Sequence, residues 1–132
     1  MTAERVLIDT TVWIEHFRDR SYPLAPLLVS LREQGRACTC GTVVAELLQG
    51  SRSDRDTALA LSLTETSTVL ADSIAAWERA GRLAALLRRK GETIALLDCY
   101  LAALAVAHGA AILSLDRHFK TIARHFPLET VA

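Results

Sequence analysis

Short apolar runs alternate with longer amphipathic stretches along the whole chain. The short runs are too brief for helices and are typical of buried strands. The predicted strands cover residues 6–8, 37–40, 69–70, 111–113 and 128–131. Apolar positions that recur with the helical period predict helices at residues 12–17, 24–34, 42–49, 54–63, 73–90, 94–107 and 117–124. Strands that alternate with helices in this way indicate an α/β domain with a largely parallel sheet.

The helix predicted at residues 94–107 differs from the others because it is apolar on almost every face. A helix of this kind is usually buried in the middle of a domain. At the start of the chain, Thr10 or Thr11 is expected to cap the first helix. Trp13 and Trp77 lie among the apolar positions of their helices, so we expect both in the core.

The composition narrows the class of protein. The chain has 132 residues, the size of one domain spanning residues 1–132, and its 51% of hydrophobic residues exclude a disordered chain. No apolar run approaches the roughly 20 residues that span a bilayer, and the N-terminus is too short and too acidic for a signal peptide. The three cysteines give no disulfide framework, and Cys38 and Cys40 are expected to be small buried residues of a strand. We therefore expect a soluble, cytoplasmic protein with no membrane partner.

Four carboxylates stand in apolar surroundings rather than on a solvated face. Asp9 and Asp116 follow predicted strands, and Glu46 and Asp98 interrupt apolar helical segments. An unpaired buried carboxylate costs several kcal/mol, so each of the four needs a partner. Taken singly, each can be a helix cap or one half of a private salt bridge, and Asp116 stands where a helix N-cap is expected.

The predicted topology brings these acids together. In an open parallel sheet, ligands bind outside the carboxyl ends of the strands, where Asp9 and Asp116 lie and where Glu46 follows within about one helical turn. Carboxylates crowded together stay protonated unless a cation balances them. Ligands made only of oxygen favour Mg²⁺ or Mn²⁺ over zinc. Such a centre suits metal-assisted hydrolysis of a phosphodiester, since no Ser-His or Cys-His pair is evident.

Four segments carry a resemblance to a known family and together extend over nearly the whole chain. They are residues 7–14 (LIDTTVWI), 44–50 (VAELLQG), 97–110 (which begin with Leu97-Asp98) and 112–119 (ILSLDRHF). In order and separation they resemble the PIN domain, specifically the VapC-type toxins of bacterial toxin–antitoxin pairs. The resemblance implies a three-layer α/β/α sandwich around a mainly parallel sheet.

The same resemblance implies an activity, a cofactor and partners. It points to an endoribonuclease that depends on Mg²⁺, with Mn²⁺ as an alternative ion, and that cleaves tRNA or rRNA. The partners implied are the RNA substrate, a small VapB-like antitoxin as inhibitor, and a second copy of the chain in a homodimer. Thr11 is expected to support Asp9 and the metal, and Cys99, where the family often has alanine, can crowd the pocket. The family's acidic quartet, both catalytic residues and metal ligands, maps onto Asp9, Glu46, Asp98 and Asp116.

Apolar helical residues are also more numerous than a monomer of this length readily hides, which supports a protein interface. They can equally complete the monomer's own core. The surplus is clearest at Trp13, Ile14, Phe17, Leu83, Leu86 and Leu87.

The zero net charge, from 15 basic and 15 acidic residues, argues against a protein that simply coats nucleic acid. Basic residues are nevertheless gathered after Asp116, where Arg117, Lys120 and Arg124 can contact RNA phosphates or simply be solvated. The histidines, at positions 16, 108, 118 and 125, form no pair with metal-ligand spacing.

Two other functions fit part of the pattern. A phospho-acceptor receiver domain is also α/β with an acidic Mg²⁺ pocket, but it needs a mid-chain acceptor aspartate and a late lysine at a strand end. Here Asp54 and Asp56 lie in polar surroundings and Lys90 closes a helix. A nuclease fold kept only as a binding module is the other alternative, and the intact acidic quartet speaks against it.

Overall fold

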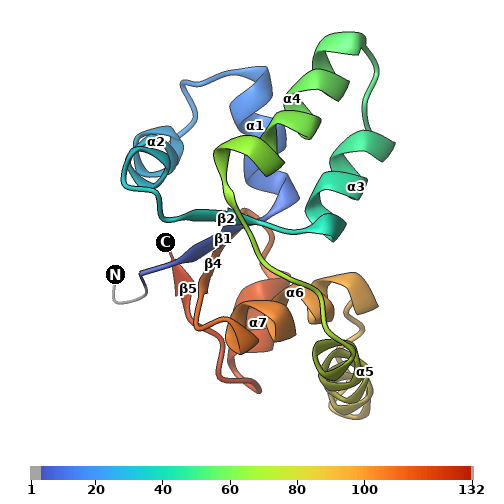
Figure 1. Ribbon diagram of the computed structural model, residues 1–132. Helices are drawn as coiled ribbons and strands as arrows, with labels where there is room; N and C mark the ends of the chain where they lie inside the picture. Colours follow the sequence, from blue (N-terminus) through green and yellow to red (C-terminus); the bar gives the residue numbers. More distant parts are fainter. Residues whose placement is uncertain (1–3, 132) are drawn as a thin grey trace.

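A five-stranded parallel sheet forms the centre of the computed structural model, which describes residues 4–131 (Figure 1). The strands lie in the order β3-β2-β1-β4-β5, so β1 is the middle strand. Every neighbouring pair is parallel. The bounds are β1 Val6–Ile8, β2 Ala37–Thr39, β3 Thr68–Val69, β4 Ala111–Leu113 and β5 Thr130–Val131.

Helices cover both faces of the sheet. Figure 1 shows α1, α2, α3 and α4 on one side of it and α5, α6 and α7 on the other. The three-layer α/β/α sandwich expected from the sequence is therefore confirmed. The helices are α1 Thr10–Arg18, α2 Ala25–Glu33, α3 Gly41–Gln49, α4 Asp54–Thr66, α5 Ile74–Arg89, α6 Leu96–Ala107 and α7 His118–Ala123.

The parallel register aligns the carboxyl ends of the two central strands. Ile8 of β1 pairs with Leu113 of β4, and the backbone N–H of Asp9 donates to the Leu113 carbonyl at 2.9 Å. Asp9 and Ser114, which come next, therefore leave the sheet at the same edge. Both strands are buried along their whole length, as expected for parallel strands covered by helices on both faces.

Helix α6 is buried almost all round. Seven successive residues, Cys99–Ala105, lie in the core, which confirms the burial predicted from its apolar sequence. Cys99, which was expected to be able to crowd the acidic site, is fully buried in the hydrophobic core directly after Asp98. Cys38 and Cys40 are buried free thiols, in line with the prediction.

Half of the apolar residues predicted as a surface surplus belong to the core instead. Trp13 and Leu87 are fully buried and Leu83 is nearly so, which means that they complete the monomer's own interior. Phe17 and Leu86 are half-buried, and Ile14 is 43% exposed. Trp77 is half-buried at the edge of the core, and so it is only in part the core residue predicted.

Several helix ends differ from the predicted ones. Helix α1 begins at Thr10 with Asp9 in the N-cap position, so the prediction that a threonine caps this helix is wrong. Thr11 lies inside the helix, and its hydroxyl donates to Asp9 rather than capping the N–H groups of the first turn. Helix α4 continues to Thr66, and hydroxyls along its last turns donate to carbonyls of the preceding turn. Helix α6 begins at Leu96, two residues later than predicted.

Within residues 4–131, no helix is both long and apolar enough to cross a membrane. The prediction that the N-terminus is not a signal peptide rests on the first five residues. Residues 1–3 lie outside the described part of the chain. Residue 132, the last of the predicted single domain, lies outside it as well.

Candidate active site

The carboxylates singled out in the sequence come from four elements near the carboxyl edge of the sheet. Asp9 follows β1 directly, and Asp116 lies three residues beyond the end of β4. Glu46 stands in α3, the helix after β2, and Asp98 stands in the first turn of α6. Helix α1 packs against α3, and α6 packs against both β4 and α7. These packings position the four side chains relative to one another.

Asp9 is held by two hydroxyl groups. It is only 4% exposed, and its Oδ2 accepts hydrogen bonds from Thr11 Oγ1 at 2.8 Å and from Ser114 Oγ at 2.7 Å. Ser114 Oγ in turn accepts from the backbone N–H of Asp116 at 2.9 Å, which ties the end of β1 to the loop after β4. Thr11 thus contacts the residue that it was predicted to support. Within residues 4–131, Asp9 Oδ1 has no hydrogen-bond partner, which leaves this oxygen for a ligand.

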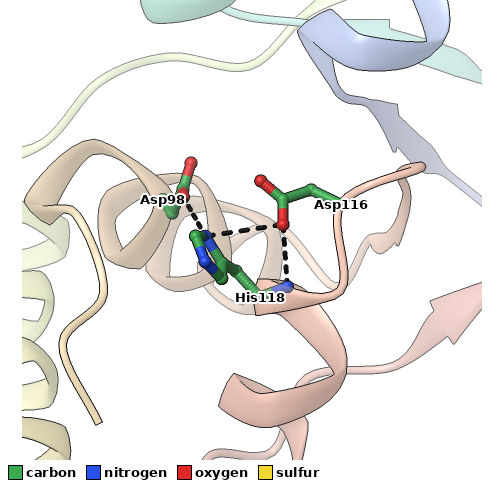
Figure 2. Close-up of side chains that lie close together, drawn as sticks. All are labelled: Asp98, Asp116 and His118. Carbon is green, nitrogen blue, oxygen red and sulfur yellow. Dashed lines mark hydrogen bonds and ion pairs between the residues drawn. The ribbon is translucent and has the colours of Figure 1, made fainter.

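Asp98, Asp116 and His118 lie close together in space (Figure 2). His118 Nδ1 is 3.2 Å from Asp98 Oδ2 and 3.4 Å from Asp116 Oδ1. The backbone N–H of His118 also donates to Asp116 Oδ1, at 2.9 Å. One ligand atom from each of the three residues lies within 4.8 Å of the other two, so a single ion can contact all three.

Burial and mutual repulsion raise the pKa of two of the carboxyl groups. Desolvation is the main cause for Glu46, and the charges of Asp9 and Asp98 raise its pKa further, while a hydrogen bond from Thr10 Oγ1 at 3.2 Å opposes them. Desolvation also raises the pKa of Asp98, helped by the charges of Asp9 and Asp116 and opposed by the nearby imidazole. The carboxylates therefore form one electrostatic cluster, which a cation would stabilise.

The donor atoms of this cluster fit a hard divalent cation. Carboxylate oxygens are the ligands that Mg²⁺ and Mn²⁺ prefer, and Mg²⁺ also keeps several of its waters. His118 adds a nitrogen donor, which transition metals accept more readily than Mg²⁺ does. His118 was not predicted from the sequence because its partners are carboxylates, one of them 20 residues away. Its position two residues after Asp116 was the only signal along the chain.

The basic residues predicted to contact RNA lie on or next to α7, in different surroundings. Arg117 occupies the N-cap position of α7 and is exposed beside Asp116. Lys120 is exposed and lines a small hollow that Asp116 also touches. Arg124 instead forms a surface ion pair with Glu92, at 3.8 Å. Arg117 and Lys120 are therefore the two that lie next to the acidic cluster.

The fold and the site define a class of protein: a parallel α/β domain with a cluster of acidic residues at the carboxyl edge of its sheet. The chain matches the family model of the PIN domain over residues 6–125. It is 33% identical over 123 residues to VapC ribonuclease Mb1587 of Mycobacterium bovis and to ribonuclease VapC11 of Mycobacterium tuberculosis. Each match covers 90% of this chain and 92% of the relative.

Solved structures share the fold at lower sequence identity. VapBC2 from Rickettsia felis, bound to a DNA fragment from their promoter, matches with a TM-score of 0.77 at 19% identity, over 96% of both chains. VapC20 from Mycobacterium tuberculosis, a sarcin-ricin loop cleaving toxin, matches with a TM-score of 0.68 at 18% identity, over 92% of this chain and 95% of that one. The present chain belongs to the PIN-domain family and, within it, to the VapC ribonuclease toxins of toxin–antitoxin systems.

The receiver-like alternative has no support in this arrangement. Lys90 is the C-cap of α5, and Lys120 lies within α7, so neither lysine stands at the end of a strand. The chain has no other lysine. The family assignment therefore replaces that alternative.

Proposed function

We propose that this chain, as one PIN domain over residues 1–132, is an endoribonuclease that depends on a divalent metal, with Mg²⁺ as the natural ion and Mn²⁺ as an alternative. Its catalytic residues and metal ligands are Asp9, Glu46, Asp98 and Asp116. The observation that carries the proposal is geometric: Asp98 and Asp116 bring ligand atoms within 4.8 Å of each other, and Ser114 links Asp9 to Asp116. Stability alone gives no reason to gather like charges in a partly buried place, whereas a bound cation does.

The chain's own residues prepare the site. Thr11 and Ser114 orient the Asp9 carboxylate through one oxygen and leave the other for the ion. When bound, the ion supplies a water of lowered pKa and stabilises the charge that develops on the scissile phosphate. Glu46, whose carboxylate accepts a hydrogen bond from Thr10, orients the attacking water.

The substrate that we propose is tRNA or rRNA in the cytoplasm. Two relatives of this chain are named ribonucleases, and VapC20 is described as cleaving the sarcin-ricin loop. Arg117 and Lys120 supply positive charge beside the acidic cluster for the phosphates of this RNA. Arg124 contributes less, because Glu92 already neutralises part of its charge.

We further propose that a small VapB-like antitoxin silences the enzyme and that the enzyme itself is a homodimer. The similar solved structures include VapBC complexes from several bacteria. A cluster of carboxylates is an obvious target for an arginine or lysine of the inhibitor, which would compete with the metal for the same oxygens.

The decisive experiment measures cleavage of a defined panel of single-stranded RNA, tRNA and rRNA fragments by wild type, Asp9→Asn and Asp98→Asn proteins. Asparagine keeps the shape of the side chain and removes its charge, so metal affinity and cleavage should both be lost. Circular dichroism checks that each variant is folded, and Glu65→Gln on the exposed end of α4 serves as the matched control. Full activity in excess EDTA, or unchanged activity of Asp98→Asn, would refute the proposal.

A further inference from the structure

A cleft of about 490 Å³ lies between α1 and the segment formed by the end of α3 and the start of α4. Glu46 lines one part of it, so the cleft is continuous with the acidic cluster. Its volume is in the range of sites that hold small organic ligands, about 300–1,000 Å³. Apart from Glu46, none of the residues that line it belongs to the proposed catalytic site.

The floor of the cleft is apolar and partly aromatic. Ile14 and Phe17 of α1 and Leu47 of α3 line it. Ile14 is 43% exposed although it is a large apolar residue. The ring of Phe17 is stacked on that of the fully buried Trp13, with centroids 5.7 Å apart, so it is held in a defined place. These side chains give the cleft an apolar wall that includes one aromatic ring.

The rim of the cleft is basic. Arg18, Arg52 and Arg55 line it, and the side chains of Arg52 and Arg55 have no ion-pair or hydrogen-bond partner within the part of the chain that the structure describes. Arg18 lies 3.4 Å from Glu15 in an exposed pair. The one acid of this rim, Asp56, already accepts a hydrogen bond from the backbone N–H of Arg52, at 3.1 Å. Two arginines are therefore free to bind an anion.

We propose that this cleft binds single-stranded RNA next to the cleavage point, with a base on Phe17 and Ile14 and phosphates on Arg52 and Arg55. The inference rests on the proposed ribonuclease function and deepens it. An aromatic platform beside a basic track is how proteins hold single strands without reading their sequence, because every base has a π-face. Arginine suits phosphate because its planar fork of donors matches two phosphate oxygens.

The dimensions agree with a short stretch of RNA. Thr10, at the start of α1, donates a hydrogen bond to Glu46, and Arg18 ends the same helix. A helix rises about 1.5 Å per residue, so the distance along α1 from Thr10 to Arg18 is about 12 Å. A stacked strand places one phosphate about every 3.4 Å, so this length corresponds to a few nucleotides. The strand thus runs from the acidic cluster along α1.

The test compares two pairs of arginines. Binding of a short fluorescein-labelled single-stranded RNA is measured by fluorescence anisotropy over a range of salt, in Asp9→Asn protein with Mg²⁺ so that the RNA stays intact. Arg52→Ala/Arg55→Ala should weaken RNA binding about tenfold at low salt. It should also make the slope of log association constant against log salt concentration less steep by about 1.4, the value for two phosphate contacts. Arg88→Ala/Arg89→Ala is the matched control, since it removes the same charge from exposed positions at the end of α5, in the opposite layer.

A second comparison tests the base platform. Phe17→Leu keeps the apolar volume that packs against Trp13 but removes the ring, and it should weaken RNA binding by roughly 5- to 50-fold. Phe17→Tyr keeps the ring and should bind as well as the parent protein. Thermal unfolding of both variants checks that the core is intact, so a loss of binding by Phe17→Leu alone reports on stacking.

Two outcomes would overturn the inference and leave the ribonuclease proposal standing. In the first, Arg52→Ala/Arg55→Ala binds RNA with an unchanged salt slope while Asp9→Asn still abolishes cleavage. In the second, the same double variant binds RNA normally but loses affinity for a synthetic peptide of the antitoxin encoded beside it, which would make the cleft a protein-binding surface. Failure of the wild-type protein to cleave any RNA with Mg²⁺ or Mn²⁺ would instead contradict the proposed function.

Discussion

The Asp9 carboxylate is oriented by two hydroxyl groups. Thr11 Oγ1 and Ser114 Oγ both donate to Asp9 Oδ2, and Thr11 Oγ1 also accepts from the backbone N–H of Leu115 at 3.1 Å. Groups that orient a metal ligand in this way affect metal affinity without touching the ion. Their contribution can be measured separately from the contribution of the carboxylates.

Thr11→Val and Ser114→Ala should each lower Mg²⁺ or Mn²⁺ affinity by about tenfold, because the Asp9 carboxylate loses one of the donors that hold it. Isothermal titration calorimetry gives the affinity directly. Thr64→Val, on the exposed side of α4, is the control for removal of a hydroxyl. Affinities within twofold of wild type for both variants would contradict the supporting role of these hydroxyls.

Asp98 makes the metal-free protein less stable at neutral pH. Burial is the main reason why the pKa of Asp98 is raised in the folded protein. At a pH between the ordinary aspartate pKa and this raised pKa, the folded state therefore binds more protons than the unfolded chain. Stability therefore falls as the pH rises through this window, and the loss is complete above the raised pKa. Asp98→Asn should accordingly melt at a higher temperature than wild type at neutral pH in EDTA.

The same comparison gives two internal checks. The advantage of Asp98→Asn should disappear at acid pH, below the ordinary aspartate pKa of about 3.9, where the wild-type carboxyl is neutral in both states. Added Mg²⁺ should raise the melting temperature of wild type and leave that of the variant nearly unchanged, since binding to the folded state stabilises it. Equal melting temperatures in EDTA at neutral pH would contradict the electrostatic account of the cluster.

The end of helix α6 shows how one element positions another. Gly109 has a φ of +65° and follows the last turn of α6, and the next residue, Ala110, donates to the Ala105 carbonyl at 2.8 Å. This reversal leads the chain directly into β4, whose far end carries Ser114 and Asp116. A glycine fits because a left-handed backbone conformation is strained for residues with a side chain.

Gly109→Ala should destabilise the fold by about 1 kcal/mol through backbone strain alone, since no neighbouring atom lies within 4 Å of the added Cβ. Gly81→Ala, inside helix α5 and equally open, should stabilise the fold by about 0.5–1 kcal/mol because alanine favours helix. Urea unfolding of the two variants measures both effects. If both variants changed the free energy of unfolding in the same direction, the backbone conformation at Gly109 would not be the controlling factor.

The complete monomer still exposes large apolar side chains after its core is filled. Leu97 and Leu115 are exposed directly before Asp98 and Asp116, and Ile74 and Leu96 are exposed at the starts of α5 and α6. Exposed apolar groups are common, but several of them around a candidate active site favour an interface with another chain.

Light scattering of the purified protein should therefore give twice the mass of the chain at tens of micromolar. Trp13, Leu83 and Leu87 do not support a dimer, because they are buried within one copy. The exposed leucines next to the acids are the remaining physical reason. A monomer over this range of concentration would contradict the homodimer, and it would leave the ribonuclease proposal unaffected.

Much of this molecule was predictable from the order of its residues. Apolar runs placed all five strands to within two residues, and the alternation with helices indicated the parallel sheet. Asp9, Glu46, Asp98 and Asp116 could be singled out because a charged residue inside an apolar run is visible without a structure. Element ends were less predictable, as at Thr11, where a side-chain contact with Asp9 replaced the expected cap.

Only the tertiary structure decided which side chains meet. Ser114 and Asp9 are 105 residues apart, and they meet because the strand order places β4 beside β1. His118 approaches Asp98 because α6 packs against α7, and the cleft with Arg52 and Arg55 exists because the start of α4 lies beside α1. Hydrophobic periodicity reports how each segment is buried by itself, whereas contacts between segments depend on strand order, register and helix packing.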